Sequence, residues 1–267
     1  MLVADVVRAV RAHLPRALIA LDFDGTLAPI VPDPADSRPE PGVIQTLVAL
    51  ARAGAQLAVI TGRDAGTAAQ MGGFDAVPGL VIEGLYGAES WQSGQLTAPA
   101  EPAEIGRLRA ALPGLLAAHV DDPGLWTEDK RLSLVVHTRR TTDPGAALSR
   151  LREPVGRLAA ELGLEVHDGR DVLEIRLPGY DKGAVLRRLV ARFEPATVLF
   201  AGDDVGDLPA FAAVWDLRAD GLPAWGVAAS SAEVTALDEV ADVHVDGPAG
   251  VLALLAAIAG AEDDPQS

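Results

Sequence analysis

The sequence predicts an α/β fold with a Rossmann-like parallel-sheet core, into which a smaller α+β domain is inserted. Short apolar runs alternate with helix-forming segments near both ends of the chain, which is typical of parallel sheets with helical crossovers. The middle of the chain instead has the order helix, two strands, helix, two strands, typical of a small antiparallel α+β domain. We therefore predict a core at residues 1–100 and 179–267 and an inserted domain at residues 101–178.

The first part of the chain has the pattern of alternating strands and helices. A strand is expected where hydrophobic residues run without interruption, and a helix where they recur at helical spacing and stop at a glycine, as before Gly54. Prolines and polar residues between the first strand and the first helix indicate a loop. The expected elements are a strand at 17–22, a loop at 29–41, a helix at 42–53, a strand at 56–61, a helix after Asp64 and a strand at 80–83.

The same patterns predict the rest of the chain. Pro99 to Pro102 indicates a linker into the middle part, and Gly179 marks the return to the core. The middle part is expected to have a helix at about 103–119, strands at about 124–128 and 131–137, a helix at about 144–162, and strands at about 164–168 and 171–176. The last part is expected to have a helix at about 182–192, strands at 197–201, 225–228 and 241–245, and a helix at 248–260.

Composition and charge narrow the classes of function. The chain has 267 residues, enough for a sizeable core, and it has no cysteine, which excludes disulfides and thiolate metal sites. A formal net charge of −16 argues against a broad nucleic-acid surface. No apolar run has the length of a membrane span, and no signal peptide is evident at the start. We expect a cytoplasmic protein, a monomer, with neither nucleic-acid nor membrane partners.

The most informative segment is Leu18 to Leu27, in which an apolar strand ends in two aspartates, Asp22 and Asp24. Open α/β sheets bind ligands at the carboxyl edge of their strands, where a tight turn would place both carboxylates. A divalent cation between the two acids would offset their repulsion, and Mg²⁺ prefers such oxygen ligands. An EF-hand loop fits poorly, because an apolar strand precedes the motif and its twelfth position is Asp33 rather than glutamate.

Three further polar segments end strands or begin helices at what would be the same edge of the core. Together the four segments are Asp22-x-Asp24-Gly-Thr, Thr61-Gly-Arg63, Lys182-Gly183 and Gly202-Asp203-Asp204-x-Gly-Asp207. Phosphoryl transfer explains this set, because an aspartate can attack phosphorus while a second acid moves protons. A cation and a lysine can then neutralise the phosphoryl oxygens. Each segment alone could be an ordinary turn or cap, so the prediction rests on their combination and order.

The ordered set resembles the haloacid dehalogenase superfamily of phosphatases, over nearly the whole chain. By this resemblance Asp22 is the nucleophile and Asp24 is the general acid and base. Thr61 and Lys182 would bind the transferring phosphoryl group. The resemblance also implies that the inserted domain is a cap that selects the substrate.

The same resemblance implies a Mg²⁺ site. Asp203 would complete this site with the Asp22 carboxylate and the Asp24 main-chain carbonyl. Asp207 is expected to support the metal and the lysine from nearby. We therefore predict Mg²⁺ as the cofactor, with Asp22, Asp24, Asp203 and Asp207 as the residues of the metal site.

Within the superfamily, the chain is most similar to the trehalose-6-phosphate phosphatase family. The segments that carry this similarity are 84–89, 128–139 and 169–176. Carried over from the family, Glu128, Lys130 and Glu174 would hold sugar hydroxyls, a role that carboxylates and ammonium groups can perform. Solvated strand positions or weak surface pairs are the alternative reading of Glu128 and Lys130, whereas Glu174 interrupts an apolar alternation.

Two arginines, Arg63 and Arg139, are further candidates for substrate binding. Arg63 could instead orient a loop, and Arg139 could be a surface strand position. The chain departs from the family pattern at Leu85-Tyr86, where many members have Asn or Glu followed by His. It departs again at residues 205–208, where only Asp207 of the usual Thr-Asp-Glu is kept.

The leading hypothesis is therefore a hydrolase of trehalose biosynthesis, a Mg²⁺-dependent phosphatase that converts trehalose 6-phosphate to trehalose and phosphate. Its partner would be a small sugar phosphate. One alternative is a related phosphatase for another sugar phosphate, such as sucrose phosphate or mannosyl-3-phosphoglycerate, because the core chemistry does not distinguish these substrates. The other is a non-catalytic sugar-phosphate sensor, against which the presence of Asp22, Asp24, Lys182 and Asp203 argues.

Overall fold

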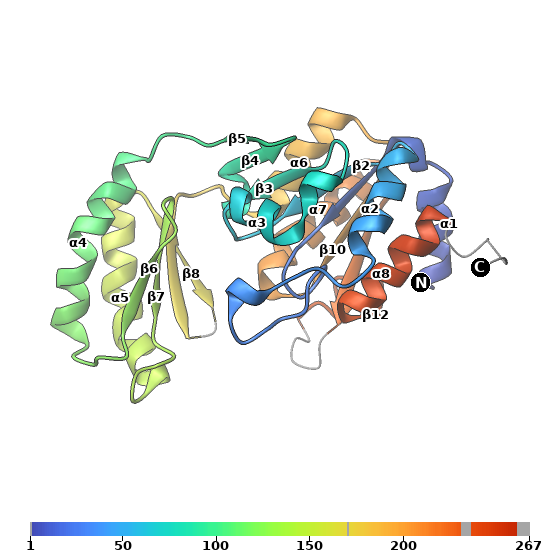
Figure 1. Cartoon of the computed structure of the whole chain (residues 1–267). Helices are drawn as coiled ribbons and strands as arrows, with labels where there is room; N and C mark the ends of the chain where they lie inside the picture. The colour runs from blue at the N-terminus through green and yellow to red at the C-terminus, as the bar shows by residue number, and fades with distance from the viewer. Residues whose placement is uncertain (1, 170, 231–235, 261–267) are drawn as a thin grey trace. The chain divides into compact units, whose positions relative to one another are not determined.

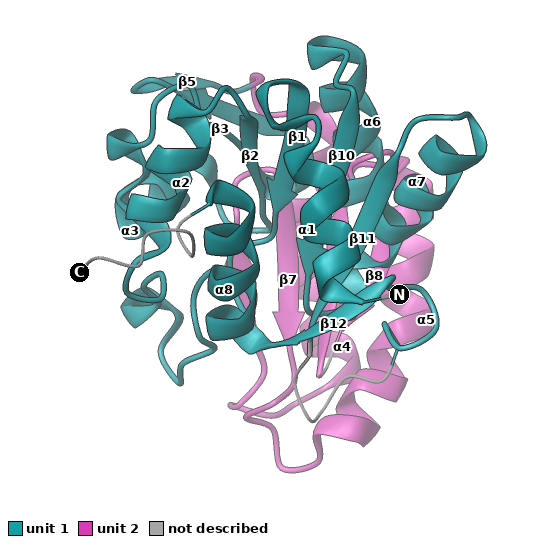
Figure 2. Ribbon diagram, turned by 90° about the vertical axis from the view of Figure 1, so that its right-hand side faces the viewer, with its two compact units in different colours: residues 1–98, 181–267 teal, residues 99–180 magenta. Residues whose placement is uncertain are grey.

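The computed structural model describes residues 2–169, 171–230 and 236–260. The chain divides into two compact units, shown in different colours in Figure 2. Unit 1 consists of residues 1–98 and 181–267, and unit 2 of residues 99–180. The α/β fold that the sequence predicts is confirmed, and each unit has its own sheet and its own hydrophobic core.

Unit 1 is built on an eight-stranded sheet in the order β12-β11-β10-β1-β2-β3-β4-β5. The six strands from β12 to β3 run parallel, whereas β4 and β5 extend the edge in antiparallel fashion. Their bounds are β1 Ala17–Leu21, β2 Gln56–Ile60, β3 Val81–Gly84, β4 Glu89–Gln92, β5 Gln95–Thr97, β10 Thr197–Gly202, β11 Ala224–Ser230 and β12 Val243–Asp246. The central strands β1 and β10 are buried along their whole length, which explains their continuous apolar sequence.

Helices cover both faces of this sheet (Figure 1). One face packs against α1 Val3–Arg11, α2 Val43–Arg52, α3 Ala65–Gly72 and α8 Gly247–Ala259. The other face packs against α6 Lys182–Phe193 and α7 Leu208–Ala219. Two aromatic edge-to-face pairs, Phe23–Phe74 and Phe200–Phe211, fill one core each. With both faces covered, the carboxyl edge of the parallel strands is the place left for a site.

Unit 2 has a four-stranded antiparallel sheet in the order β6-β7-β9-β8. Its elements are α4 Ala103–His119, β6 Trp126–Asp129, β7 Ser133–His137, α5 Pro144–Leu162, β8 Glu165–Gly169 and β9 Val172–Arg176. Leu134, Val136, Leu173 and Ile175 alternate along the strands and pack against the two helices. Both helices therefore cover one face of the sheet (Figure 1), and polar side chains alternate onto the other face.

Several elements were not expected from the sequence. The spacing of Val3, Val6 and Val10 in α1 is a helical signal that our prediction missed. Helix α7 gives a weaker signal, because apolar residues occur on all its sides. The antiparallel strands β4 and β5 are short, and β5 is exposed, so no apolar run marks them. Among the described residues, no helix has both the length and the apolar character to cross a membrane.

Candidate active site

Asp22 lies at the carboxyl end of β1, where the chain leaves the sheet. The strand continues for one more residue beyond Leu21, because the Asp22 N–H donates to the carbonyl of Ala201 at 2.9 Å. The chain then turns through Gly25, whose φ of 79° favours glycine. A Cβ at Gly25 would lie 1.9 Å from Oδ2 of Asp203, so the turn also brings the backbone close to that carboxylate. Glycine at this position therefore allows two neighbouring strand ends to form one site.

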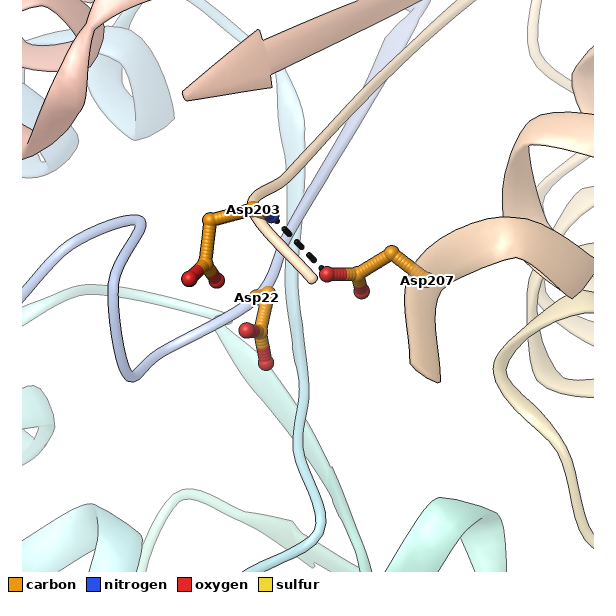
Figure 3. Close-up of side chains that lie close together, drawn as sticks. All are labelled: Asp22, Asp203 and Asp207. Atoms are coloured by element: carbon orange, nitrogen blue, oxygen red, sulfur yellow. Dashed lines mark hydrogen bonds between the residues drawn. The ribbon is translucent and has the colours of Figure 1, made fainter. Parts of the chain in front are cut away.

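Asp203 and Asp207 follow β10, the strand beside β1. Oδ2 of Asp207 accepts from the backbone N–H groups of Asp203 and Asp204, at 2.9 and 3.1 Å. These hydrogen bonds fix the turn between β10 and α7. The Thr26 hydroxyl, which comes from the segment after β1, donates to Oδ1 of Asp203 at 3.3 Å. Oxygen atoms of Asp22, Asp203 and Asp207 all lie within 4.8 Å of one another (Figure 3).

Lys182 contacts a carboxylate at each of the two strand ends, Asp22 after β1 and Asp207 after β10. It is the first residue of α6, and the helix N-terminus is capped by Asp181, whose side chain accepts from the Ala184 N–H. Its Nζ lies 2.7 Å from Oδ1 of Asp22 and 2.7 Å from Oδ1 of Asp207. Only 4% of the Lys182 side chain is exposed, so this ammonium is stabilised by its carboxylate neighbours.

The cluster carries more negative than positive charge. Burial raises the pKa of Asp22 well above its ordinary value, although attraction to Lys182 works in the opposite direction. Burial, together with Asp207 and Asp204, raises the pKa of Asp203 to about 7. For Lys182, burial alone would lower the pKa, but attraction to Asp207 and Asp22 outweighs it and raises the pKa. Three buried carboxylates around one ammonium thus favour a further cation.

The donor set fits a hard divalent cation. Carboxylate oxygens are the ligands that Mg²⁺ prefers. Both oxygens of Asp207 already accept from Lys182 or from the backbone, which favours a supporting role for this residue. Asp22 and Asp203 are the better candidates for direct coordination, and the surplus negative charge described above is the condition that a bound cation would relieve.

Asp24 has a different environment from Asp22. Its side chain is 37% exposed and forms a two-point ion pair with Arg63: Nε lies 2.6 Å from Oδ2 and Nη2 lies 2.7 Å from Oδ1. The Ser37 hydroxyl donates to the same Oδ1 at 3.0 Å. The structure therefore places Arg63, which is predicted to bind substrate, in contact with Asp24, the predicted acid and base.

Thr61 directly follows the neighbouring strand β2 and is buried. Its backbone N–H donates to the carbonyl of Glu83 on β3, so Thr61 extends the parallel sheet by one residue. Its hydroxyl oxygen accepts from the Arg63 N–H at 3.1 Å. Thr61, Asp22 and Asp203 thus all follow parallel strands of the same sheet, at its carboxyl edge.

The candidate sugar-binding residues of unit 2 lie on the polar face of its sheet. Glu128 pairs with Val135 across β6 and β7, and Glu174 pairs with the same residue across β7 and β9. Directly paired residues point to one face, so Glu128 and Glu174 share a face. Lys130 follows β6, and its Nζ lies 3.7 Å from Oε1 of Glu174. The structure thus brings these three predicted residues together.

Other side chains of this face were not predicted as site residues. Ser133 donates to Oε1 of Glu174 at 2.9 Å, and Nε2 of His137 lies 3.0 Å from Oε2 of Glu128. The His137 ring stacks on Trp126, with a centroid separation of 3.8 Å. Burial lowers the pKa of His137 despite the nearby Glu128 carboxylate, which favours a neutral ring. Their alternation with buried apolar residues on β7 is the sequence signal that could have identified them.

Strand pairing does not place Arg139 on this polar face. It lies two residues beyond the end of β7 and is exposed. Among the described residues, the strand pairing therefore groups Glu128 and Glu174, with Lys130 bound to Glu174, but leaves Arg139 on the following turn. The role of Arg139 in substrate binding stays a prediction.

Comparison with known proteins identifies relatives over the part of the chain that contains all these candidate residues. A family model described as trehalose-phosphatase matches residues 20–242. The trehalose-phosphate phosphatase of Mycobacterium marinum is 33% identical over 222 residues, which cover 75% of this chain and 52% of that protein. The chain thus spans about half the length of the curated relatives that it matches.

Solved structures share the fold over nearly the full chain. A crystal structure of Aspergillus fumigatus trehalose-6-phosphate phosphatase is 27% identical, has a TM-score of 0.73 and covers 98% of both chains. The C-terminal domain of the trehalose-6-phosphate phosphatase of C. albicans has a TM-score of 0.77 at 24% identity, covering 97% of both chains. The second similarity concerns the fold alone, while the first also extends to the sequence.

Proposed function

Because this chain belongs to the trehalose-phosphatase family, we propose that it hydrolyses trehalose 6-phosphate to trehalose and inorganic phosphate. The observation that carries the proposal is the buried cluster at the carboxyl edge of unit 1. There, Nζ of Lys182 lies 2.7 Å from both Asp22 and Asp207, and Asp203 completes the group. A nucleophilic carboxylate beside a fixed ammonium is the arrangement that phosphoryl transfer needs.

In the first step, an oxygen of Asp22 attacks phosphorus. The bond between phosphorus and the sugar oxygen breaks as the bond to Asp22 forms, which leaves an aspartyl-phosphate. Asp24 gives its proton to the departing sugar oxygen, because an alkoxide is a poor leaving group. Lys182 and Thr61 hold the phosphoryl oxygens while this occurs.

In the second step, a water molecule attacks the phosphorus of the aspartyl-phosphate. Asp24, now ionised, accepts a proton from this water. The bond between phosphorus and Asp22 breaks, so inorganic phosphate leaves and the Asp22 carboxylate is restored. Asp24 regains the proton that it gave away, so the cycle closes without any further reactant.

We propose Mg²⁺ as the cofactor of this site. Asp22, Asp203 and the main-chain carbonyl of Asp24 would hold the ion, with Asp207 in support. When bound, Mg²⁺ would offset the surplus negative charge of the buried carboxylates and polarise the phosphoryl oxygens. The raised pKa values of Asp22 and Asp203 support this proposal, because a cation would return both groups to their ionised forms.

We propose that unit 2 is the cap domain and that it selects the sugar. Glu128, Lys130 and Glu174 offer acceptors and donors of the kind that sugar hydroxyls require. Phosphatases for sucrose phosphate or mannosyl-3-phosphoglycerate would use the same chemistry at unit 1. The choice of trehalose 6-phosphate therefore rests on the family and on these three residues.

Phosphate release from a panel of substrates tests the proposal. The panel contains trehalose 6-phosphate, sucrose 6-phosphate, glucose 6-phosphate and p-nitrophenyl phosphate, each with Mg²⁺ and with EDTA. We expect metal-dependent release with a strong preference for trehalose 6-phosphate. Metal-dependent release without that preference would contradict the sugar assignment and leave the chemistry of unit 1 in place.

A non-catalytic sensor is tested by the same panel with Asp22→Asn as the control variant. This substitution keeps the shape of the side chain but removes the nucleophilic carboxylate. We expect the variant to bind trehalose 6-phosphate and to lose turnover on every substrate, by about three orders of magnitude or more. Wild-type protein that binds the sugar phosphate but releases no phosphate would instead identify a sensor.

A further inference from the structure

Asp24 is held from two sides by side chains that come from different loops. Arg63, which follows β2, donates from Nε to Oδ2 and from Nη2 to Oδ1, at 2.6 and 2.7 Å. Ser37 lies in the proline-rich segment between β1 and α2, is 1% exposed, and donates its hydroxyl to Oδ1 at 3.0 Å. A carboxylate with three donors from two fixed directions has one orientation.

Arg63 is the more buried member of its ion pair with Asp24. Its side chain is 17% exposed, against 37% for that of Asp24, so the carboxylate is the more open member. The third nitrogen, Nη1, contacts Sδ of Met71 at 3.4 Å, and the guanidinium lies 5.7 Å from the centre of the Phe23 ring. Each nitrogen of Arg63 thus has a partner within unit 1.

The loop that carries Arg63 is itself fixed by a strained turn. Leu85 and Tyr86, directly after β3, have φ angles of 48° and 56°, a conformation that costs energy for side chains of this kind. In this conformation their N–H groups donate to the carbonyls of Arg63 and Thr61, at 2.8 and 3.0 Å. The same turn therefore sets both the Thr61 position and the base of the Arg63 side chain.

We infer that Arg63, with Ser37, is a positioning residue that fixes the orientation of the Asp24 carboxylate, and that it does not bind the substrate. The inference rests on the proposed function, in which Asp24 exchanges a proton with the sugar oxygen and with water. Proton transfer requires the acid within hydrogen-bond reach of the reacting oxygen, so a carboxylate that rotates freely is a poorer catalyst. Of these three residues, only Asp24 meets the reacting atoms, and Arg63 and Ser37 act through it.

A double-mutant cycle between Arg63→Gln and Asp24→Asn tests this inference. Turnover is measured with trehalose 6-phosphate and with p-nitrophenyl phosphate, whose good leaving group keeps the rates of the double variant measurable. We expect Arg63→Gln to lower kcat for trehalose 6-phosphate about 100-fold and to change KM by less than about threefold. In the Asp24→Asn background, the same substitution should cost less than about twofold, because the residue it positions is already disabled.

Ser37→Ala is the milder variant and covers the case in which Arg63→Gln does not fold. It removes one hydroxyl, and we expect a kcat loss of about three- to tenfold that likewise disappears in the Asp24→Asn background. Two results would overturn the inference and make Arg63 a substrate-binding residue. One is a raised KM for trehalose 6-phosphate in Arg63→Gln. The other is an equal fold-loss of kcat from Arg63→Gln in the wild-type and the Asp24→Asn backgrounds. If Asp24→Asn itself turns over like wild type, the proposed acid and base is wrong, which is a separate failure.

Discussion

The carboxyl edge of the sheet in unit 1 and the polar face of the sheet in unit 2 both gather charged side chains, but in opposite ways. At the edge, Asp22, Asp207 and Lys182 are buried and contact one another through turns at strand and helix ends. On the face, Glu128 and Lys130 are half-buried side chains at or just beyond the end of a strand. The edge fixes charges by backbone geometry, whereas the face presents them on a regular strand.

This difference has a consequence for substitutions. A change at the edge moves backbone and carboxylates together, so it should affect every substrate alike. A change on the face replaces one side chain on an intact strand, so it should affect only the substrates whose sugar contacts that side chain. If unit 2 selects the sugar as proposed, the two regions separate the reaction from its specificity, and substitutions in each test that separation.

Among the substitutions that compare the two regions, Gly25→Ala should have the largest effect. The new Cβ would lie 1.9 Å from Oδ2 of Asp203, in a backbone conformation with φ of 79°. Displacing Asp203 should lower kcat/KM about 100-fold or more on both trehalose 6-phosphate and p-nitrophenyl phosphate, and should weaken Mg²⁺ binding. Steady-state kinetics and a Mg²⁺ titration measure the two effects.

Gly73→Ala is the matched control for this substitution. Gly73 also has a positive φ, of 65°, but a Cβ there would meet no atom within 4 Å. It should cost about 1 kcal/mol of stability and leave kcat unchanged. Equal losses of activity in both variants would mean that backbone strain, and not the contact with Asp203, explains the effect.

Glu174→Gln should have a smaller and more selective effect. It keeps the shape of the side chain but removes the charge beside Lys130 and Ser133. We expect KM for trehalose 6-phosphate to rise about tenfold, because a charged hydrogen-bond acceptor is lost, while kinetics on p-nitrophenyl phosphate stay unchanged. Parallel kinetics on the two substrates provide the measurement.

Asp168→Asn is the control on the same sheet. Asp168 pairs with Leu173 in the ladder, so it lies on the helix-covered side of the sheet, where it binds Arg152. Loss of this exposed ion pair should cost at most about 1 kcal/mol and leave both substrates unaffected. If Glu174→Gln instead impairs both substrates equally, unit 2 does not select the sugar through this residue.

The last prediction concerns stability, through pH and Mg²⁺. Burial raises the folded-state pKa of Asp203 to about 7, above its ordinary value of about 3.9. The folded protein therefore binds a proton more tightly than the unfolded chain does. The resulting stability is complete below about pH 4 and is lost as the pH rises through about 7, at up to about 1.4 kcal/mol for each pKa unit.

Thermal unfolding checks this effect. In EDTA, the Tm should be lower at pH 8 than at pH 5.5, and Mg²⁺ should raise the Tm more at pH 8, where Asp203 is ionised. Asp203→Asn should remove that part of the pH dependence. A Tm that responds to neither pH nor Mg²⁺, with wild type and variant alike, would contradict a metal site at the edge.

The sequence predicts the site at the carboxyl edge of unit 1 better than the polar face of unit 2. Asp22, Thr61 and Asp203 each follow an apolar strand, and parallel strands place such residues at one edge whatever the details of packing. The contact of Ser37 with Asp24 had no such signal, because the proline-rich loop has no periodic pattern. The hydrogen bonds of Glu174 depend on strand register, which alternation alone does not determine.

Trapping of the covalent intermediate tests directly whether Asp22 is the nucleophile. A single turnover of ³²P-labelled trehalose 6-phosphate is quenched in acid, and the labelled peptide is identified after proteolysis. We expect the label on Asp22, its decay as phosphate is released, and its absence from Asp22→Asn. Label on another residue, or rapid turnover with no labelled protein at any time, would contradict this role of Asp22.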